Sequence, residues 1–153
     1  MDLADKFPDC HVTGTDLSAI QPIFVPQNLQ FEIDDCEQEW LYSKPFDFIH
    51  MRSLGGSIAD WPKLLKRAYD NLVPGGWLQV TDCETWVSTD DDSLPIEAPL
   101  HQFTEKAGEA AIKFGKIMNI APEHERLLKE AGFEAVVDTT VKVGIISVPA
   151  LLP

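Results

Sequence analysis

Segments with strand character alternate along this chain with segments of helical periodicity. Short apolar-rich runs predict strands at His11–Asp16, Leu29–Ile33, Phe46–Met51 and Trp77–Asp82. After the third run, Asp60 caps a helix that has Pro62 in its first turn, and apolar residues recur at helical spacing as far as Leu72. Strands that alternate with helices form layered α/β structures with mainly parallel strands. The sequence therefore predicts an α/β sandwich around a mainly parallel sheet.

The second half of the chain is expected to be mostly helical. Residues 88–99 are polar and interrupted by proline, which predicts a loop before a long helix from Leu100 to Met118. Pro122 begins a shorter helix that Gly132 ends, and the β-branched run at 133–146 predicts a last strand. With 153 residues the chain suits one hydrophobic core. We interpret 1–153 as a single domain with a cap-like helical insertion at about 86–120.

The charge of the chain limits its partners. The formal net charge is -13, and a surface this acidic repels phosphate backbones and anionic lipid. No apolar run approaches the roughly 18 residues of a membrane helix. The three cysteines, Cys10, Cys36 and Cys83, are odd in number and far apart in the sequence, which suggests reduced thiols rather than disulfides. We therefore expect an intracellular protein, cytoplasmic or nuclear, that binds neither nucleic acid nor membrane.

Metal binding is not expected. The sequence has no CxxC or HxxxH pair, which are common ligand spacings in structural zinc sites. The three consecutive acids Asp90, Asp91 and Asp92 carry oxygen ligands of the kind that hard cations prefer, but neighbouring loop acids usually point in different directions into water.

The first predicted strand ends on an acid, Asp16. Nucleotide-binding α/β folds use an acid at this position to accept hydrogen bonds from ribose hydroxyls, and a simple turn or helix-cap aspartate is the alternative. Such folds carry a glycine-rich turn about 20 residues earlier. Only ten residues precede His11 here, and none is glycine. Asp16 and the adjacent Leu17 are thus candidates for one half of a cofactor site.

Four stretches resemble fungal class I methyltransferases of the LaeA-like (UMTA-type) family. They are "GTDLSAIQP", "FEIDDCEQEW", the block from Phe46 to Asp82, and "LLKEAGFEAV". The resemblance covers nearly the whole chain, and the block Phe46–Asp82 is its most specific part. It implies a Rossmann-like sandwich that uses S-adenosylmethionine to methylate a small molecule, in a family common near secondary-metabolite genes.

The resemblance also implies a truncated domain. The family has a first strand and a glycine-rich turn before the point where this chain begins, and a last strand after the point where it ends. In the family's strand order the first strand lies between the strands matching His11–Asp16 and Phe46–Met51. Its absence would leave two unpaired strand edges, which invite pairing with another chain. We therefore expect a fragment, a truncated product or a subunit completed by a protein partner, inactive by itself.

The resemblance assigns further cofactor contacts. Asp35 matches an acid that meets the adenine amino group, and the backbone amide of Cys36 matches one that meets a ring nitrogen. His50 and Met51 match a segment beside the transferring methyl group. His50 is the candidate general base, since the ordinary pKa of histidine is about 6.5, and a partly buried histidine bonded to the backbone is the alternative.

Three residues are candidates for the substrate side of the site: Arg52, Asp82 and His101. Arg52 follows the third strand and either orients an acidic group of the substrate or pairs with Asp82, of which we favour the pairing. Asp82 ends the fourth strand, and His101 lies near the start of the long helix that could cap a substrate pocket.

Two other classes of function compete with a methyltransferase. The scaffold could serve as a non-catalytic interaction or regulatory subunit that pairs with another protein. The chain could also be half of a nicotinamide-dependent dehydrogenase, because Asp16 alone does not distinguish one adenosine ribose from another. The blocks "PFDFIHMR" and "LVPGGWLQV" favour the first two readings over the third.

Overall fold

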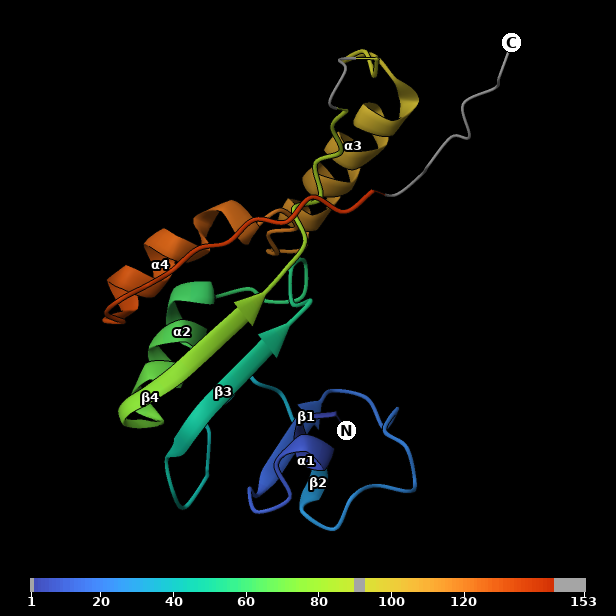
Figure 1. The fold of residues 1–153 in the computed structure, drawn as a ribbon. Helices are drawn as coiled ribbons and strands as arrows, with labels where there is room; N and C mark the ends of the chain where they lie inside the picture. Colours follow the sequence, from blue (N-terminus) through green and yellow to red (C-terminus); the bar gives the residue numbers. More distant parts are fainter. Residues whose placement is uncertain (1, 90–92, 145–153) are drawn as a thin grey trace.

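A computed structural model describes residues 2–89 and 93–144 of the chain. Helices and strands alternate as the sequence predicts, and the fold is α/β (Figure 1). In chain order the elements are α1 (Asp2–Lys6), β1 (Val12–Asp16), β2 (Leu29–Ile33), β3 (Phe46–Arg52), α2 (Trp61–Asp70), β4 (Leu72–Thr81), α3 (Pro99–Lys113), a 3-10 turn (Ala121–Glu123) and α4 (His124–Ala131).

All strand pairing among the described residues is parallel. β1 pairs with β2, placing Asp16 opposite Ile33, and β3 pairs with β4, placing His50 opposite Gln79. These are two separate two-stranded sheets, so no described strand joins β1 to β3. Figure 1 shows β1, β2 and α1 grouped on one side of β3, while α2 and α4 lie on the other side of the β3–β4 pair. The parallel arrangement is confirmed, and the interruption falls between β1 and β3, where the family resemblance implies it.

The main hydrophobic core lies between α2, α4 and one face of β3–β4. Asp60 caps α2 by accepting a hydrogen bond from the Lys63 amide at 3.0 Å, as predicted. The helix then buries one apolar face, made of Trp61, Leu64, Leu65 and Ala68. Full burial of a large apolar side chain contributes roughly 1.5–3 kcal/mol. This core therefore fixes β3 and β4, and with them the strand ends that precede the candidate site.

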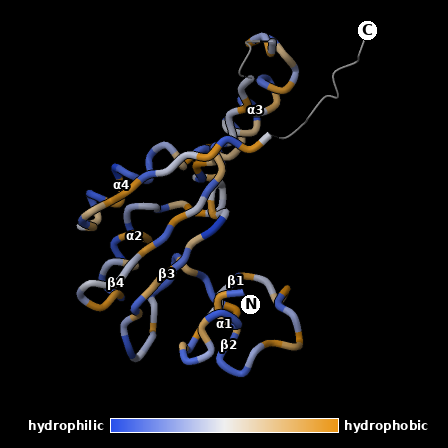
Figure 2. The backbone as a smooth tube through the Cα atoms, viewed as in Figure 1, coloured by the Kyte–Doolittle hydropathy of each residue, from blue (hydrophilic) through white to orange (hydrophobic). Residues whose placement is uncertain are grey.

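The opposite face of the β3–β4 pair is uncovered in the part of the chain that the structure describes. Phe48 is 40% exposed and its register partner Trp77 is 70% exposed. The loop between β1 and β2 is also apolar and open, with Ile23 92% and Phe24 89% exposed; Figure 2 shows hydrophobic positions along it. Apolar surface of this kind is typical of a face that another segment or chain covers.

The boundary between α2 and β4 differs from the prediction. The sequence predicts helical spacing as far as Leu72 and a strand that starts only at Trp77. Instead α2 ends at Asp70 and β4 begins at Leu72, so that Pro74 lies inside the strand. Proline has no amide hydrogen to donate to a neighbouring strand. Pro74 fits inside β4 because it lies between the pairings of Phe46 with Leu72 and of Phe48 with Trp77, where the register is irregular.

The prediction of a last strand at 133–146 is wrong for the residues that the structure describes. Residues 133–144 form no strand, and 145–146 lie outside the described part of the chain. Val137, Val141 and Val143 are 84%, 74% and 80% exposed. β-branched residues favour strands through packing against neighbouring strands, and no described strand is a neighbour here.

The long helix is shorter than predicted. α3 ends at Lys113 rather than Met118, because Gly115 adopts a φ of 71°. The Gly115 amide donates to the carbonyl of Ile112, and the Lys116 amide donates to that of Ala111, which closes the helix in a Schellman motif. In Figure 1, α3 extends away from both sheets. None of the described helices is long and apolar enough to cross a membrane.

Candidate functional site

The carboxyl ends of β1 and β2 bring three acids to one edge. Asp16 ends β1, and Asp34 and Asp35 directly follow Ile33, the register partner of Asp16. The Asp34 amide donates a hydrogen bond to the Asp16 carbonyl at 3.1 Å. Open α/β sheets place ligands at this edge. The structure therefore brings together Asp16 and Asp35, as their positions at the ends of two strands predict.

The Asp16 side chain combines the two roles that the sequence leaves open. Its Oδ1 accepts a hydrogen bond from the Ser18 amide at 2.8 Å, which makes it a turn aspartate. The residue is exposed, and no described group bonds its Oδ2. Leu17 is 70% exposed beside it. A carboxylate held by one oxygen at the end of a strand keeps the other available for a hydroxyl group.

Asp35 and Cys36 form a tight turn after β2. Asp35 accepts a hydrogen bond from the Glu37 amide at 2.9 Å through Oδ1 and one from Gln38 Nε2 at 3.3 Å through Oδ2. The Cys36 carbonyl accepts from Trp40 Nε1 at 3.0 Å, which fixes the backbone here. Burial raises the pKa of the Cys36 thiol, and the charges of Asp35 and Glu37 raise it further. Cys36 thus stays protonated and is no nucleophile at neutral pH.

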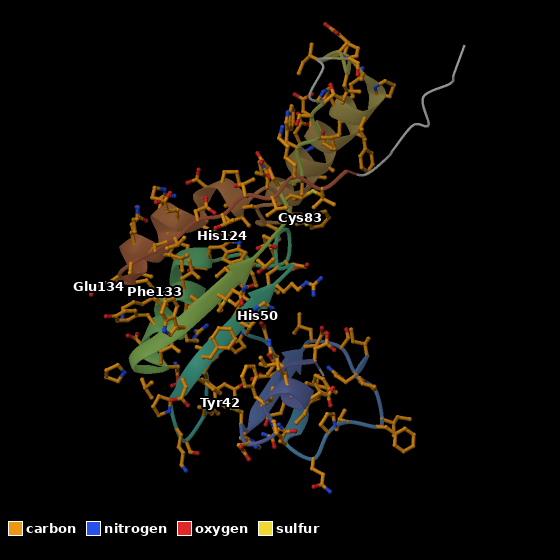
Figure 3. All side chains as sticks on the ribbon, viewed as in Figure 1. Tyr42, His50, Cys83, His124, Phe133 and Glu134 are labelled. Atoms are coloured by element: carbon orange, nitrogen blue, oxygen red, sulfur yellow. The ribbon has the colours of Figure 1, made fainter. Side chains whose placement is uncertain are left out.

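The three residues at the end of β3 point in different ways. Met51 is 6% exposed and packs in the core, so its side chain faces away from the open edge. His50 and Arg52 are exposed. The His50 ring stacks on Phe48 with 6.3 Å between ring centroids, on the uncovered face of β3 (Figure 3). His50 is therefore exposed and is not the partly buried histidine that the sequence leaves as the alternative.

A small cavity of about 150 Å³ lies beyond the ends of β3 and β4. Its wall comes from the loop after β3, the segment after β4 and the connection before α4. The lining residues are Ser53, Gly55, Asp82, Cys83, Thr85 and Met118. Hydroxyl, thiol and thioether groups therefore surround a space at the edge where this fold binds ligands.

Asp82 does not face this cavity as a free acid. Its side chain is only 3% exposed, its Oδ1 accepts a hydrogen bond from the Gly55 amide at 3.0 Å, and its Oδ2 lies 3.0 Å from His124 Nε2. Asp82 therefore pairs with His124, and the expectation that it pairs with Arg52 is wrong. Sequence reasoning missed His124, because the two partners are 42 residues apart and no local pattern connects them.

His101 lies away from the cavity lining. It is 7% exposed on α3 and packs against Trp86, with 5.3 Å between ring centroids. Its Nδ1 is buried without a hydrogen-bond partner among the described residues. The residue therefore helps to hold α3 against the segment after β4 rather than lining the space beside Asp82.

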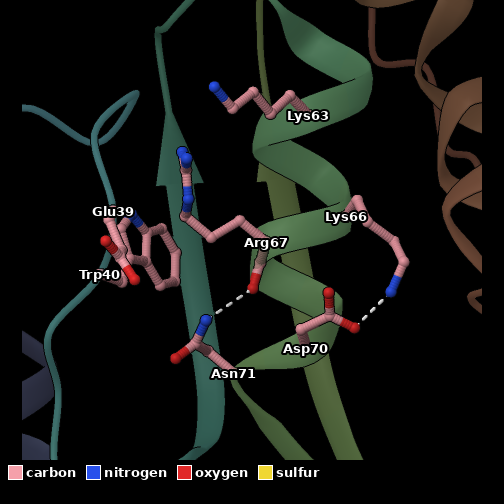
Figure 4. Close-up of a pocket in the computed structure, with 7 residues that line it drawn as sticks. All are labelled: Glu39, Trp40, Lys63, Lys66, Arg67, Asp70 and Asn71. Atoms are coloured by element: carbon pink, nitrogen blue, oxygen red, sulfur yellow. Dashed lines mark hydrogen bonds and ion pairs between the residues drawn. The ribbon is translucent and has the colours of Figure 1, made fainter.

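A larger and more open cavity of about 350 Å³ runs along α2 (Figure 4). Its lining residues are Glu39, Trp40, Lys63, Lys66, Arg67, Asp70 and Asn71. Lys66 pairs with Asp70, and Arg67 Nη1 donates to the Cys36 carbonyl at 3.1 Å. Because two of its three cations already have protein partners and it lies beside the helix, this groove is a weaker candidate than the strand ends.

No group of three or more histidine, cysteine or acidic side chains in residues 2–89 and 93–144 is arranged to hold a metal ion. The three acids at 90–92 lie outside the described residues.

Comparison with known proteins identifies the family. Residues 2–138 match the methyltransferase domain family. The chain is 37% identical over 138 residues to methyltransferase pytC of Aspergillus terreus, covering 90% of this chain and 43% of that protein. It is 34% identical over 148 residues to the secondary metabolism regulator LAE1 of Cochliobolus heterostrophus (94% and 48%), and 36% identical over 137 residues to laeA of Aspergillus fumigatus (87% and 36%).

The chain thus spans less than half the length of these relatives. Its Rossmann-like α/β order with parallel strands agrees with the family match. The predicted resemblance is confirmed, and the chain belongs to the methyltransferase domain family, with a fungal methyltransferase and fungal secondary metabolism regulators of the LaeA type among its relatives.

Proposed function

We propose that this chain is part of an S-adenosylmethionine-dependent methyltransferase that acts on a small molecule of secondary metabolism. The observation that carries the proposal is that Asp16 and Asp35 follow the parallel strands β1 and β2, and that the cavity beside Asp82 follows the parallel strands β3 and β4. Open α/β sheets bind ligands at the carboxyl ends of their strands. The membership of the methyltransferase domain family supports it.

The residues on this edge fit the adenosine half of the cofactor. The open oxygen of Asp16 suits a ribose hydroxyl, because an ionised carboxylate only accepts hydrogen bonds. Asp35 suits the exocyclic amine of adenine, and the backbone amide of Cys36 suits a ring nitrogen. Bound S-adenosylmethionine supplies a methyl group already activated on a sulfonium.

The remaining demands on the protein are modest. The chain must hold the acceptor in line with the methyl group and exclude water. The 150 Å³ cavity is the proposed acceptor pocket, and residues 86–120, including α3, are its proposed cap. Arg52 is exposed near this edge and suits an acidic group on the acceptor. His50 acts as general base only for an acceptor that must lose a proton.

The separation of the two sheets sets the expected activity of the chain by itself. Because no described strand joins β1 to β3, the Asp16 edge and the Asp82 edge are not held together by backbone hydrogen bonds. If only a small fraction of the molecules has both edges in the arrangement that binds the cofactor, the apparent affinity for the cofactor is reduced by that fraction. We expect the 153-residue chain alone to bind S-adenosylmethionine weakly or not at all, and not to turn over.

The test is to purify residues 1–153 and to measure oligomeric state, cofactor affinity by calorimetry and methyl transfer on the same sample. Weak binding that strengthens when a protein partner or further sequence joins β1 to β3 would support the proposal. A monomer with micromolar affinity and turnover would show that the two edges need no joining strand.

A non-catalytic interaction subunit is the second candidate. The uncovered face of β3–β4, with Trp77 70% and Phe48 40% exposed, favours it, because monomers rarely leave aromatic side chains together in water. Two of the relatives above are named regulators of secondary metabolism. The two candidates separate in one comparison: a methyltransferase loses its biological effect when Asp16 becomes alanine, and an interaction subunit loses it when Trp77 does.

A further inference from the structure

Three segments that are distant in the sequence meet around the 150 Å³ cavity. The first is the loop 53–56 after β3, the second is the segment after β4 that starts at Asp82, and the third is the connection 117–124 that leads into α4. In Figure 3, Cys83 lies beyond the arrowhead of β4, and His124 lies above the same end of the strand.

The loop 53–56 is docked tightly onto the connection. The Gly56 amide donates a hydrogen bond to the Ile117 carbonyl at 2.9 Å. A Cβ added at Gly55 would lie 2.9 Å from the Met118 carbonyl oxygen, so the two backbones approach closer than a side chain permits. Ser53, at the start of the loop, has a φ of 56°, which is costly for a residue other than glycine. Contacts beyond the loop must therefore hold its shape.

Asp82 provides one of these contacts. One of its oxygens accepts from the Gly55 amide in the loop at 3.0 Å, and the other lies 3.0 Å from His124 Nε2 at the start of α4. With 3% of its side chain exposed, Asp82 has no water to replace a lost partner. A buried carboxylate that loses a hydrogen-bond donor is left unsatisfied, which costs free energy. The arrangement in which both oxygens of Asp82 are bonded is therefore strongly preferred.

His124 connects this pair to the core. It is the first residue of α4, its side chain is 12% exposed, and its ring lies edge-on to Trp61 with 4.7 Å between centroids. Trp61 is 1% exposed at the start of α2. The orientation of the imidazole, and through it that of the Asp82 carboxylate, is thus set by the main core rather than by the cavity.

We propose that Asp82 and His124 are a positioning pair, which fixes the shape of the acceptor pocket by holding loop 53–56 and the connection into α4 against the ends of β3 and β4. Asp82 lines the cavity, but Gly55 and His124 already occupy both of its oxygens, so this assignment gives neither side chain a hydrogen bond to the acceptor. The inference rests on the proposed function only in naming the cavity an acceptor pocket.

The test is backbone hydrogen exchange followed by NMR on the 153-residue chain without cofactor. Asp82→Ala removes both bonds, and we expect the Gly55 and Gly56 amides to exchange about tenfold faster or more. Amides in the middle of α2, such as those of Leu65 and Ala68, should keep their rates. Asp70→Ala, which removes the acid of an exposed pair on α2, is the matched control and should leave Gly55 unchanged.

Two milder variants keep the test decisive if Asp82→Ala does not fold. Asp82→Asn retains an oxygen that can accept from Gly55, so it should restore near-normal exchange there. His124→Phe keeps a ring beside Trp61 but has no nitrogen to bond Asp82, and it should speed exchange at both Gly55 and Gly56. Unchanged exchange at these two glycines in folded Asp82→Ala or His124→Phe would overturn the positioning pair.

The result is independent of the proposed function. Faster exchange in the 153-residue chain, together with no methyl transfer even by a protein in which β1 and β3 are joined, would leave the positioning pair standing and remove the acceptor pocket. Normal exchange in a protein that does transfer them would remove the positioning pair alone.

Discussion

Glu37 and Lys116, 79 residues apart in the sequence, form an ion pair with 3.0 Å between Oε2 and Nζ. The other oxygen of Glu37 accepts hydrogen bonds from the amides of Ala59 and Asp60 at 2.8 and 2.9 Å. One carboxylate thus ties the turn after β2 to the start of α2 and to the segment after α3. In the described structure it is a polar link between the β1–β2 part and the rest.

Replacing Glu37 with glutamine should lower stability in a pH-dependent way. Burial raises the pKa of Glu37, but the hydrogen bonds from Asp60, Lys116 and Ala59 together lower it by more, so it lies below its ordinary value. A lowered folded-state pKa stabilises the protein above the unfolded pKa of about 4.3, and this stability is lost as the pH falls through the folded-state pKa.

We therefore expect Glu37→Gln to cost about 1 kcal/mol at pH 7 and much less once the pH lies below the folded-state pKa of Glu37. Urea unfolding at several pH values measures the difference. Glu125→Gln, which breaks the exposed pair with Lys129, is the control and should have little effect at any pH. A loss of stability for Glu37→Gln that is equal at pH 7 and below the folded-state pKa would contradict the assigned role of the charge.

Replacing Asp16 with alanine should weaken cofactor binding in a protein whose two sheets are joined. A hydrogen bond to a charged group contributes about 1.5–3 kcal/mol, so the loss corresponds to roughly ten- to a hundredfold in affinity. Calorimetry with S-adenosylmethionine measures it. Asp9→Ala, at the opposite end of β1, is the matched control. Equal affinities for the two variants would remove Asp16 from the site.

Adding a methyl group at Gly55 should disturb the loop beside the cavity. The new Cβ would meet the Met118 carbonyl oxygen at 2.9 Å, and a backbone atom cannot swing aside as a side chain does. Gly108→Ala on α3 is the contrasting change, since nothing lies within 4 Å of its Cβ. Thermal unfolding should show a loss for Gly55→Ala and a gain of about 0.5–1 kcal/mol for Gly108→Ala. A neutral Gly55→Ala would mean that the loop is not docked as described.

The core under β3–β4 should dominate the stability of the chain. Leu65 is 0% exposed on α2, and truncating a fully buried leucine to alanine costs about 2–5 kcal/mol. Leu41, 86% exposed in the loop before β3, is the control for which we expect less than about 0.5 kcal/mol. Chemical denaturation of both variants compares them directly, and similar losses would place the core elsewhere.

The sequence by itself determined the elements whose signals are local. The alternation of apolar residues located β1, β2 and β3, and the spacing from Asp60 located α2 with its cap. The position of Asp16 at the end of β1 followed from the strand boundary alone. These features depend on residues close to one another in the sequence, so the periodicity of apolar residues is enough to predict them.

Only the tertiary structure decided the features that depend on distant partners. The β-branched run at 133–144 is no strand, because no described strand pairs with it. β4 includes Pro74, because the pairing with β3 is irregular there and requires no amide hydrogen from the proline. Asp82 looked like a substrate acid until the fold brought His124 to it. The role of a buried polar side chain depends on which hydrogen-bonding groups surround it. In this fold those groups come from segments far apart in the sequence, and no local sequence pattern connects such segments.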